Sequence, residues 1–194
     1  MKLIFEEREL VFKEDSIIMK DSWLPETETE IMMSWEDSLM KRHAEVVCSN
    51  GGDILEIGFG MGISANYIQG LNPTSHTIVE NHPQIIEKLE EWASDKPNVK
   101  IVNGSWYNKQ DEFGIYDGIF YDAFGDRDWK KFKDVLPNIT KEGTIFTFWN
   151  NCADRTNNHD LDEEYDVIYE EIEVDPPQNS YFNHKKYYLP KVII

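Results

Sequence analysis

The chain has 194 residues, of which 40% are hydrophobic, and this length and composition fit one compact domain, residues 1–194, with a proper core. It carries 19 Lys and Arg against 37 Asp and Glu, so the net charge of −18 argues against nucleic acid as a partner and favours a cationic substrate, unless the acidity only serves solubility. With only two cysteines and no metal-binding His/Cys spacing, we expect neither a disulfide framework nor a metal site. The sequence shows no apolar run near the ~20 residues of a membrane span, which argues against a membrane protein. Because it also shows no secretory signal, we expect a cytoplasmic protein.

The first 25 or so residues are predicted to form an extension, either a lid or an extra β-hairpin, because Leu3 to Phe5 and Leu10 to Phe12 are strand-like. From Glu26 to about Val47 we expect one amphipathic helix. Its start, Thr27-Glu28-Thr29-Glu30, has the T-x-x-E form of a capping box. The apolar stripe of this helix consists of Ile31, Met32, Trp35, Leu39 and Met40.

A glycine-dense turn follows the strand predicted over Asp53 to Ile57, and it is the most informative feature of the chain. The run Gly58-Phe59-Gly60-Met61-Gly62 lets the backbone turn sharply and approach a ligand that a Cβ would keep away. The next strand, His76 to Glu80, ends in a carboxylate about 20 residues on, which is placed to bind a ribose diol. We therefore predict an adenosine-containing cofactor; the alternative is an ordinary strand–turn–helix with flexible glycines.

The spacing of the glycines distinguishes between cofactors. A dinucleotide fingerprint reads G-x-G-x-x-G, but the sixth position here is Ile63, and glycine comes one residue earlier. With Glu56 two residues before the turn, the E-x-G-x-G-x-G form resembles the first motif of S-adenosylmethionine-dependent methyltransferases. In those enzymes the loop faces the methionine half of the cofactor.

The rest of the chain alternates strands and helices. Helices are expected over Pro83 to Ala93 and Asp128 to Leu136, and strands over Val99 to Asn103, Tyr116 to Asp122, Gly143 to Asn150, Asp166 to Val174 and Asn183 to Ile193. This order predicts an α/β fold with a mostly parallel, doubly wound sheet that ends in an antiparallel pair. Ligands of such sheets bind beyond the carboxyl ends of the strands, where we expect the Gly58 loop, Glu80, Gly104 to Trp106, Asp122 and Asn150.

Three residues of this rim or near it are candidates for chemistry. Asp122 ends an apolar strand, where an acid is costly to bury unless it is paired or used; it would otherwise be a helix N-cap. Glu36 is a second candidate acid, or else a solvated helix carboxylate. Trp106 either stacks on adenine or belongs to the core.

Several motifs together resemble a known family. Glu30 to Met40, with the form M-x-x-W-E-x-x-x-M, the loop Gly58-Phe59-Gly60-Met61 and the pair Tyr121-Asp122 are similar to guanidinoacetate N-methyltransferase and to the protein-arginine methyltransferase that modifies the δ-nitrogen. The resemblance runs from about Met32 to the C-terminus, including Tyr187-Tyr188-Leu189-Pro190. It implies a Rossmann-like class I methyltransferase with a seven-stranded, mostly parallel sheet and a C-terminal antiparallel β-pair.

The resemblance also implies roles for individual residues. Glu36 and Asp122 are expected to be the catalytic acids that grip a guanidinium, with Asp122 as proton acceptor; Asn151 and Cys152 complete the substrate site. S-adenosylmethionine is the expected cofactor, leaving as S-adenosylhomocysteine. Its expected contacts are Met32, Met40, Gly58, Phe59, Gly60, Met61, Gly62, Ile63, Glu80, Asn81, Ser105, Trp106 and Asp122.

The chain departs from the family in places that concern the substrate. Ala123-Phe124 stands where the family usually has Thr-Tyr, and the segment Asp154 to Tyr165 is shorter. The leading hypothesis is an N-methyltransferase of a small guanidino compound, as a monomer or homodimer. The alternatives are a protein-arginine methyltransferase, an amine or carboxylate methyltransferase on the same scaffold, and a non-catalytic cofactor-binding module. The Asp/Asn-Pro-Pro-aromatic motif of nucleic-acid amino-methyltransferases is lacking.

Overall fold

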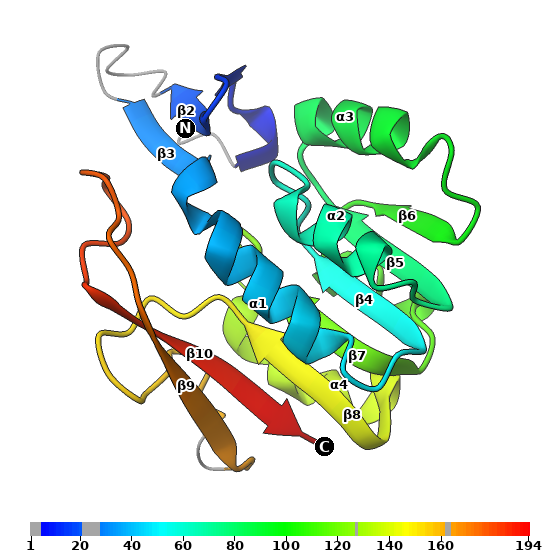
Figure 1. The fold of residues 1–194 in the computed structure, drawn as a ribbon. Helices are drawn as coiled ribbons and strands as arrows, with labels where there is room; N and C mark the ends of the chain where they lie inside the picture. Colours follow the sequence, from blue (N-terminus) through cyan, green and yellow to red (C-terminus); the bar gives the residue numbers. More distant parts are fainter. Residues whose placement is uncertain (1–4, 21–27, 127, 162–163) are drawn as a thin grey trace.

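The computed structural model describes residues 5–20, 28–126, 128–161 and 164–194, and these form two β-sheets with helices packed around the larger one (Figure 1). The larger sheet has seven strands in the order β6-β5-β4-β7-β8-β10-β9. Its first five strands pair in parallel, and the last two are antiparallel. The bounds are β4 Asp53–Ile57, β5 Ser75–Glu80, β6 Val99–Asn103, β7 Tyr116–Tyr121, β8 Thr140–Phe148, β9 Val167–Glu173 and β10 Lys186–Ile193.

This topology confirms the predicted mostly parallel, seven-stranded sheet with a C-terminal antiparallel pair. The central strands are buried on both faces, which is why they read as nearly continuous apolar runs. Neighbouring residues of β4 serve the two faces: Leu55 packs in one core cluster and Ile54 in another. The sheet is therefore covered by helices on both sides.

The helices α1 (Asp37–Val47), α2 (Ile63–Gly70) and α3 (Pro83–Ala93) precede or follow the first strands, and α1 lies across the front of the sheet in Figure 1. The short helix α4 (Leu136–Ile139) lies behind it. Short 3-10 helices complete the connections: η1 Phe5–Glu7, η2 Ser34–Glu36, η3 Trp106–Asn108, η4 Gln110–Glu112 and η5 Trp129–Asp134. Among the described residues, none of the helices has the length and apolar character that crossing a membrane would require.

The smaller sheet comprises β1 (Leu10–Phe12), β2 (Ser16–Lys20) and β3 (Glu28–Met33), all antiparallel. The strand expected over Leu10 to Phe12 is confirmed, and it forms a hairpin with β2. Of the other strand-like segment, Phe5 lies in η1, while Leu3 and Ile4 lie outside the described residues.

The helix expected from Glu26 to Val47 is wrong in its first half. Residues Glu28–Met33 form β3, and the α-helix begins only at Asp37. Strand β2 supplies a pairing partner for these residues that a local helix pattern does not reveal, and pairing of this kind overrides helix propensity. The expected capping box is wrong too, because Glu30 lies in the strand and Thr27 outside the described residues.

The helix expected over Asp128 to Leu136 is a 3-10 helix, η5, followed by the separate α4. Pro137 explains the interruption, since it has no N–H to donate to the preceding turn and its ring clashes with that turn. It is tolerated in the first turn of the new helix, α4.

Candidate functional site

A cavity of about 320 Å³ opens at the carboxyl ends of β4 to β7. Its lining comes from several segments of the described chain that are far apart in sequence. Among the lining residues are Met32, Glu36, Gly58, Phe59, Gly60, Ser64, Glu80, Asn81, Ser105, Trp106, Asp122, Asp126, Trp149, Asn151 and Tyr181.

The glycine loop forms one wall of this cavity, and its glycines are required by close contacts. A Cβ on Gly58, whose φ is +91°, would lie 2.0 Å from the backbone oxygen of Asp122. A Cβ on Gly60, with φ +52°, would lie 2.6 Å from Sδ of Met32. The same sulfur accepts a hydrogen bond of 3.3 Å from the Met61 amide, so β3 holds the loop in place. With Gly58 and Gly60 carrying no side chains, this wall fits the adenosyl cofactor expected from the sequence.

Glu80 fixes the loop from the end of β5. Its Oε2 accepts a hydrogen bond from the Phe59 amide at 3.0 Å, and its Oε1 accepts from the amides of Asn81 and His82 at 2.8 Å each. The side chain is only 5% exposed, and burial raises the pKa of this carboxyl. With one acceptor position left on Oε2, Glu80 can still take a hydrogen bond from a ligand hydroxyl, as a ribose would require.

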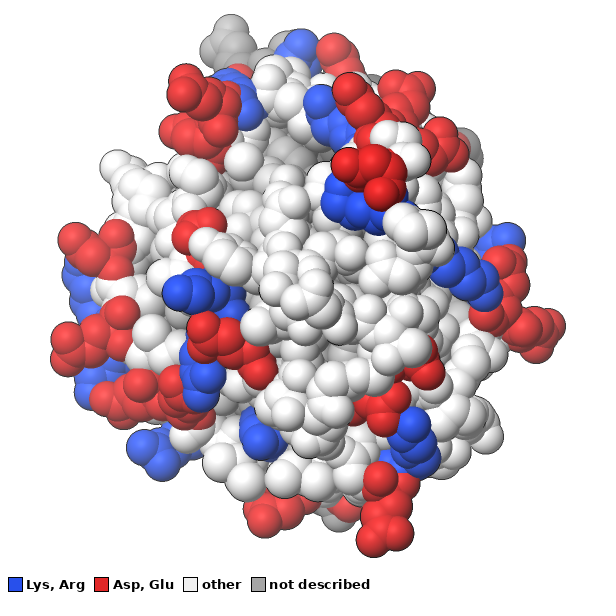
Figure 2. Space-filling view, turned by 45° about the vertical axis from the view of Figure 1, so that its right-hand side comes forward, with Lys and Arg blue, Asp and Glu red and all other residues white. Residues whose placement is uncertain are grey.

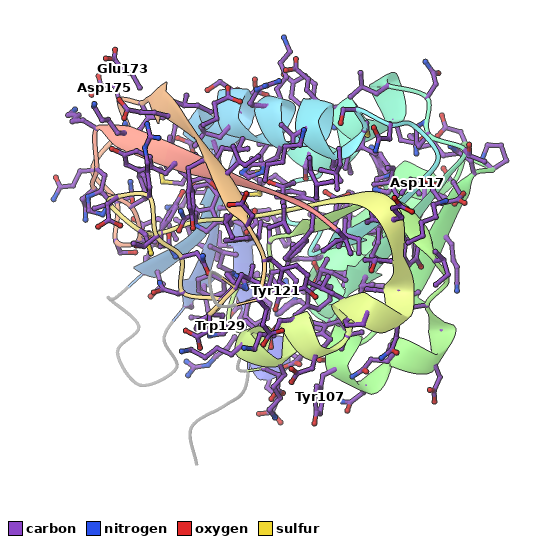
Figure 3. All side chains as sticks on the ribbon, turned by 90° about the horizontal axis from the view of Figure 1, so that it is seen from below. Tyr107, Asp117, Tyr121, Trp129, Glu173 and Asp175 are labelled. Atoms are coloured by element: carbon purple, nitrogen blue, oxygen red, sulfur yellow. The ribbon has the colours of Figure 1, made fainter. Side chains whose placement is uncertain are left out.

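Trp106 lines the cavity but is only 2% exposed, so it belongs to the core as well as to the wall. Its ring meets Phe132 edge-on at 4.9 Å, and its indole N–H donates to Oδ2 of Asp126. Asp126 also accepts hydrogen bonds from the Tyr121 hydroxyl and, at 2.8 Å, from the Asp128 amide. Figure 3 shows Tyr121 close to η5, where Trp129 is labelled. Asp126 therefore fixes this side of the cavity, a role that its sequence context did not indicate.

Glu36 lies in η2, directly after β3, and is only 3% exposed. Its Oε1 accepts hydrogen bonds from the Met33 amide at 2.9 Å and from the Tyr181 hydroxyl at 2.5 Å. Burial raises the pKa of this carboxyl to about 7, although both hydrogen bonds act to lower it. No described residue donates a hydrogen bond to the second oxygen, Oε2.

Asp122 follows β7 on the other side of the glycine loop. Its amide donates to the Ile57 oxygen at 2.8 Å, but no described residue donates to its carboxyl group. Burial raises the pKa of this carboxyl well above its ordinary value, and the negative charges of Glu36 and Glu56 raise it further. Two acids with unused acceptor oxygens thus line one cavity, an arrangement that suits a cation with several N–H donors.

A second cavity of about 240 Å³ shares Asp122, Ala123, Trp149 and Asn151 with the first. His159 also lines it, and burial lowers the pKa of this imidazole to about 4, so the ring is neutral at pH 7. The second cavity therefore extends the site on the far side of Asp122, away from the glycine loop.

A buried hydrogen-bond chain positions the backbone beside this second cavity. The Thr147 hydroxyl donates to the Pro190 oxygen, so it accepts from Nδ1–H of His43 at 2.8 Å. Burial lowers the pKa of His43 to about 3, and the neutral ring must then accept from the Tyr187 hydroxyl through Nε2. The Tyr187 oxygen in turn accepts from the Asn150 amide at 3.0 Å. This series of hydrogen bonds ends at Asn150, the residue before Asn151.

The structure brings most of the predicted site residues to the first cavity. Among the described residues, five lie outside its lining: Met40, Met61, Gly62, Ile63 and Cys152. The prediction missed Tyr181, Asp126 and Trp149, which line it. No group of three or more His, Cys, Asp or Glu within the described ranges could hold a metal ion.

Comparisons with known proteins agree with this geometry. A family model described as guanidinoacetate N-methyltransferase matches residues 19–192. The chain is 32% identical to protein arginine N-methyltransferase 2 of Saccharomyces cerevisiae, over 97% of this chain and 52% of that protein. It is 34% identical to the protein of that name in Yarrowia lipolytica, over 75% of this chain and 32% of that protein. The chain thus spans about half the length, or less, of these curated relatives.

Solved structures share the fold. Precorrin-6y C5,15-methyltransferase from Geobacter metallireducens aligns with a TM-score of 0.63 at 14% identity, covering 83% of this chain and 88% of that one. Spermidine synthase from Thermotoga maritima aligns with a TM-score of 0.63 at 11% identity, over 95% and 72%. Because the family model matches nearly the whole chain, the protein belongs to the guanidinoacetate N-methyltransferase family.

Proposed function

We propose that the chain transfers a methyl group from S-adenosylmethionine to a nitrogen of a small guanidino compound, resembling guanidinoacetate or arginine. The observation that carries the proposal is a pair of acids, buried Glu36 and half-buried Asp122, that line one cavity. Oε2 of Glu36 and both carboxyl oxygens of Asp122 accept no hydrogen bond from a described residue. A planar guanidinium offers N–H donors in several directions and would satisfy both acids at once. The charge of −18 on the chain favours the same class of substrate.

Bound S-adenosylmethionine supplies an electrophilic methyl group. Glu36 and Asp122 bind and orient the guanidinium, and this positioning supplies much of the catalysis. When a nitrogen gains the methyl group it must lose a proton, and Asp122 accepts that proton. We assign this role to Asp122 because no described residue donates to its carboxyl group, whereas Glu36 is held through Oε1.

The cofactor contacts are part of the proposal. Glu80 would bind the ribose, and Gly58, Phe59 and Gly60 the methionine half, with Met32, Asn81, Ser105 and Trp106 around them. Met40, which is fully buried, and Met61, Gly62 and Ile63 would support this wall from behind. Asn151 and Cys152 would meet the far end of the acceptor. We further propose a single domain that works in the cytoplasm as a monomer or homodimer, without nucleic acid.

A protein-arginine substrate is the second candidate, because the curated relatives carry that name. The same pair of acids would hold the side chain of an arginine. The two candidates differ in the size of the acceptor, so peptides and free guanidino compounds distinguish them.

The test is to incubate the protein with S-adenosylmethionine labelled in the methyl group and with a panel of guanidino compounds, amines and arginine peptides. We expect label in one or more guanidino compounds, and a loss of about 10²-fold or more in Asp122→Asn. Asp117→Asn is the matched control, since Asp117 lies at the opposite end of β7 (Figure 3). Label only in amines, or full turnover by Asp122→Asn, would overturn the proposal.

A further inference from the structure

The connection between β9 and β10 contains a tight turn, residues 177–182, which we call the C-terminal turn. Asn179 holds it together: its Oδ1 accepts from the amides of Tyr181 at 3.0 Å and Phe182 at 2.7 Å. Its Nδ2 donates to the oxygens of Pro177 and Phe182, both at 2.9 Å. The backbone around Tyr181 is therefore fixed by one buried side chain.

The C-terminal turn is also attached to the N-terminal part of the chain. The Ser180 hydroxyl donates to Oε2 of Glu30 on β3, at 2.5 Å across 150 positions of sequence. The ring of Phe182 stacks on Trp35 at 5.7 Å. These contacts hold Tyr181 against η2, where Glu36 lies, at one end of the first cavity.

The directions of the hydrogen bonds at Tyr181 follow from the donors present. The indole of Trp35 can only donate, and its Nε1 lies 3.0 Å from the Tyr181 oxygen. The single hydroxyl proton of Tyr181 is then directed to Oε1 of Glu36. The Met33 amide donates to the same oxygen at 2.9 Å. Because Oε1 receives both donors, Oε2 is the oxygen left to meet a ligand.

We infer that Tyr181 is a positioning residue of the acceptor site: it fixes the Glu36 carboxyl through Oε1, so that Oε2 alone exchanges between a proton and the N–H of the bound cation. The acceptor part of this inference rests on the proposed function. The hydrogen-bond part does not, since it concerns Tyr181 and Glu36 in the protein itself.

A pH dependence follows from this arrangement. With Oε1 occupied by two donors, the proton of neutral Glu36 sits on Oε2, and it must leave before a guanidinium can bind there. The groups that face Glu36 are Asp122 after β7, Tyr181 on the C-terminal turn and Tyr187 on β10. The Tyr181 hydroxyl favours the ionised form of Glu36, so removing it should shift this proton exchange to higher pH.

The test compares Tyr181→Phe with Tyr67→Phe, in which the lost hydroxyl donates to Asp37 on the exposed side of α1. Carbon-detected NMR of the Glu36 carboxyl should show its titration moving to higher pH in Tyr181→Phe and staying unchanged in Tyr67→Phe. For a guanidino acceptor, kcat/KM at pH 7 should fall about tenfold in Tyr181→Phe alone. The acid limb of its pH profile should move in the same direction, while S-adenosylhomocysteine binds unchanged.

A second variant covers the case in which Tyr181→Phe does not fold. Fluorotyrosine at position 181 keeps the shape of the side chain and is a stronger donor, so it should shift the Glu36 titration to lower pH. An unchanged Glu36 titration in a folded variant would overturn the inference. Failure of the wild type to methylate any guanidino compound would overturn the proposed function instead, and the NMR titration would still decide the role of Tyr181.

Discussion

The positions of Glu36 and Asp122 make ionisation of their carboxyl groups energetically unfavourable. A buried carboxyl that lacks hydrogen-bond donors resists ionisation, and the raised pKa values of both acids express this cost. Neither acid makes enough contacts within the described protein to offset it. A cationic ligand would supply the missing donors. We therefore interpret the two acids as residues that lower the stability of the fold and serve ligand binding instead.

The first prediction concerns Glu36→Gln. The pKa of Glu36 is about 7 in the folded protein against an ordinary value of 4.5, so its contribution to stability is present below pH 4.5 and is lost as the pH rises through 7. Glutamine has no such titration. The free energy of unfolding of the variant, minus that of the wild type, should therefore rise by up to ~3 kcal/mol between about pH 5 and about pH 8.

Urea denaturation at several pH values measures this difference. Glu87→Gln, on the exposed side of α3, is the control and should show no such trend. A stability difference between wild type and Glu36→Gln that is constant over this range would contradict the prediction.

The second prediction concerns Glu80→Ala. The substitution removes the acceptor of three backbone amides, among them that of Phe59 in the glycine loop, together with the acceptor proposed for the ribose. We expect S-adenosylhomocysteine to bind ~1–3 kcal/mol more weakly. Calorimetry measures this directly, and an affinity equal to that of the wild type would remove Glu80 from the cofactor site.

At the scale of elements, the positions of the parallel strands along the chain could be predicted because each central strand is a short apolar run next to a turn signal. The glycine loop and Glu80, at the end of the next strand, have a characteristic spacing in the sequence. The cofactor side of the site could therefore be predicted as well. Strand β3 could not be predicted, because its pairing with β2 depends on residues 8 to 17 positions away and not on its own pattern.

The acceptor side of the site could be predicted only in part, for the same reason. Glu36 and Asp122 belong to motifs, but Tyr181 reaches Glu36 across 145 positions of sequence, from a turn that no local pattern marks as functional. Asp126 likewise acts through side chains that the fold brings to it. Contacts of this kind arise from the packing of distant segments.

The third prediction concerns the chain of hydrogen bonds that connects α1, β8 and β10. Tyr187→Phe should leave the Asn150 amide without its acceptor and His43 Nε2 without its donor. We expect a loss of ~1–3 kcal/mol in the free energy of unfolding, together with faster hydrogen exchange of the Asn150 amide.

Denaturation and amide exchange measured by NMR test this prediction, with Tyr67→Phe as the control that loses an exposed hydroxyl. Unchanged exchange at Asn150 in the Tyr187 variant would show that the chain of hydrogen bonds does not position this backbone.

At the scale of the whole molecule, the dominant property is the excess of acidic residues. Figure 2 shows acidic and basic side chains interspersed around the edge of one face, with uncharged residues in its middle. A net charge of −18 creates a long-range field that attracts cations, and salt screens it.

The fourth prediction follows from this field. For a guanidino acceptor with a net positive charge, kcat/KM should fall several-fold as ionic strength rises from about 0.02 M to about 0.5 M. A zwitterionic acceptor, with no net charge, should be much less affected. Equal salt dependence of both acceptors in steady-state assays would show that the acidic surface does not steer the substrate.

The central claim is that Glu36 and Asp122 together bind the charge and the N–H groups of a guanidinium. Its most direct test is calorimetric titration of the protein, saturated with S-adenosylhomocysteine, with a guanidino compound and with its ureido isostere, in which a carbonyl oxygen replaces one nitrogen. We predict that the guanidino member of at least one pair binds and that its ureido counterpart binds about 100-fold more weakly or not at all, since hydrogen bonds to charged groups are lost. Equal affinity of the two members in every pair that binds would contradict the account.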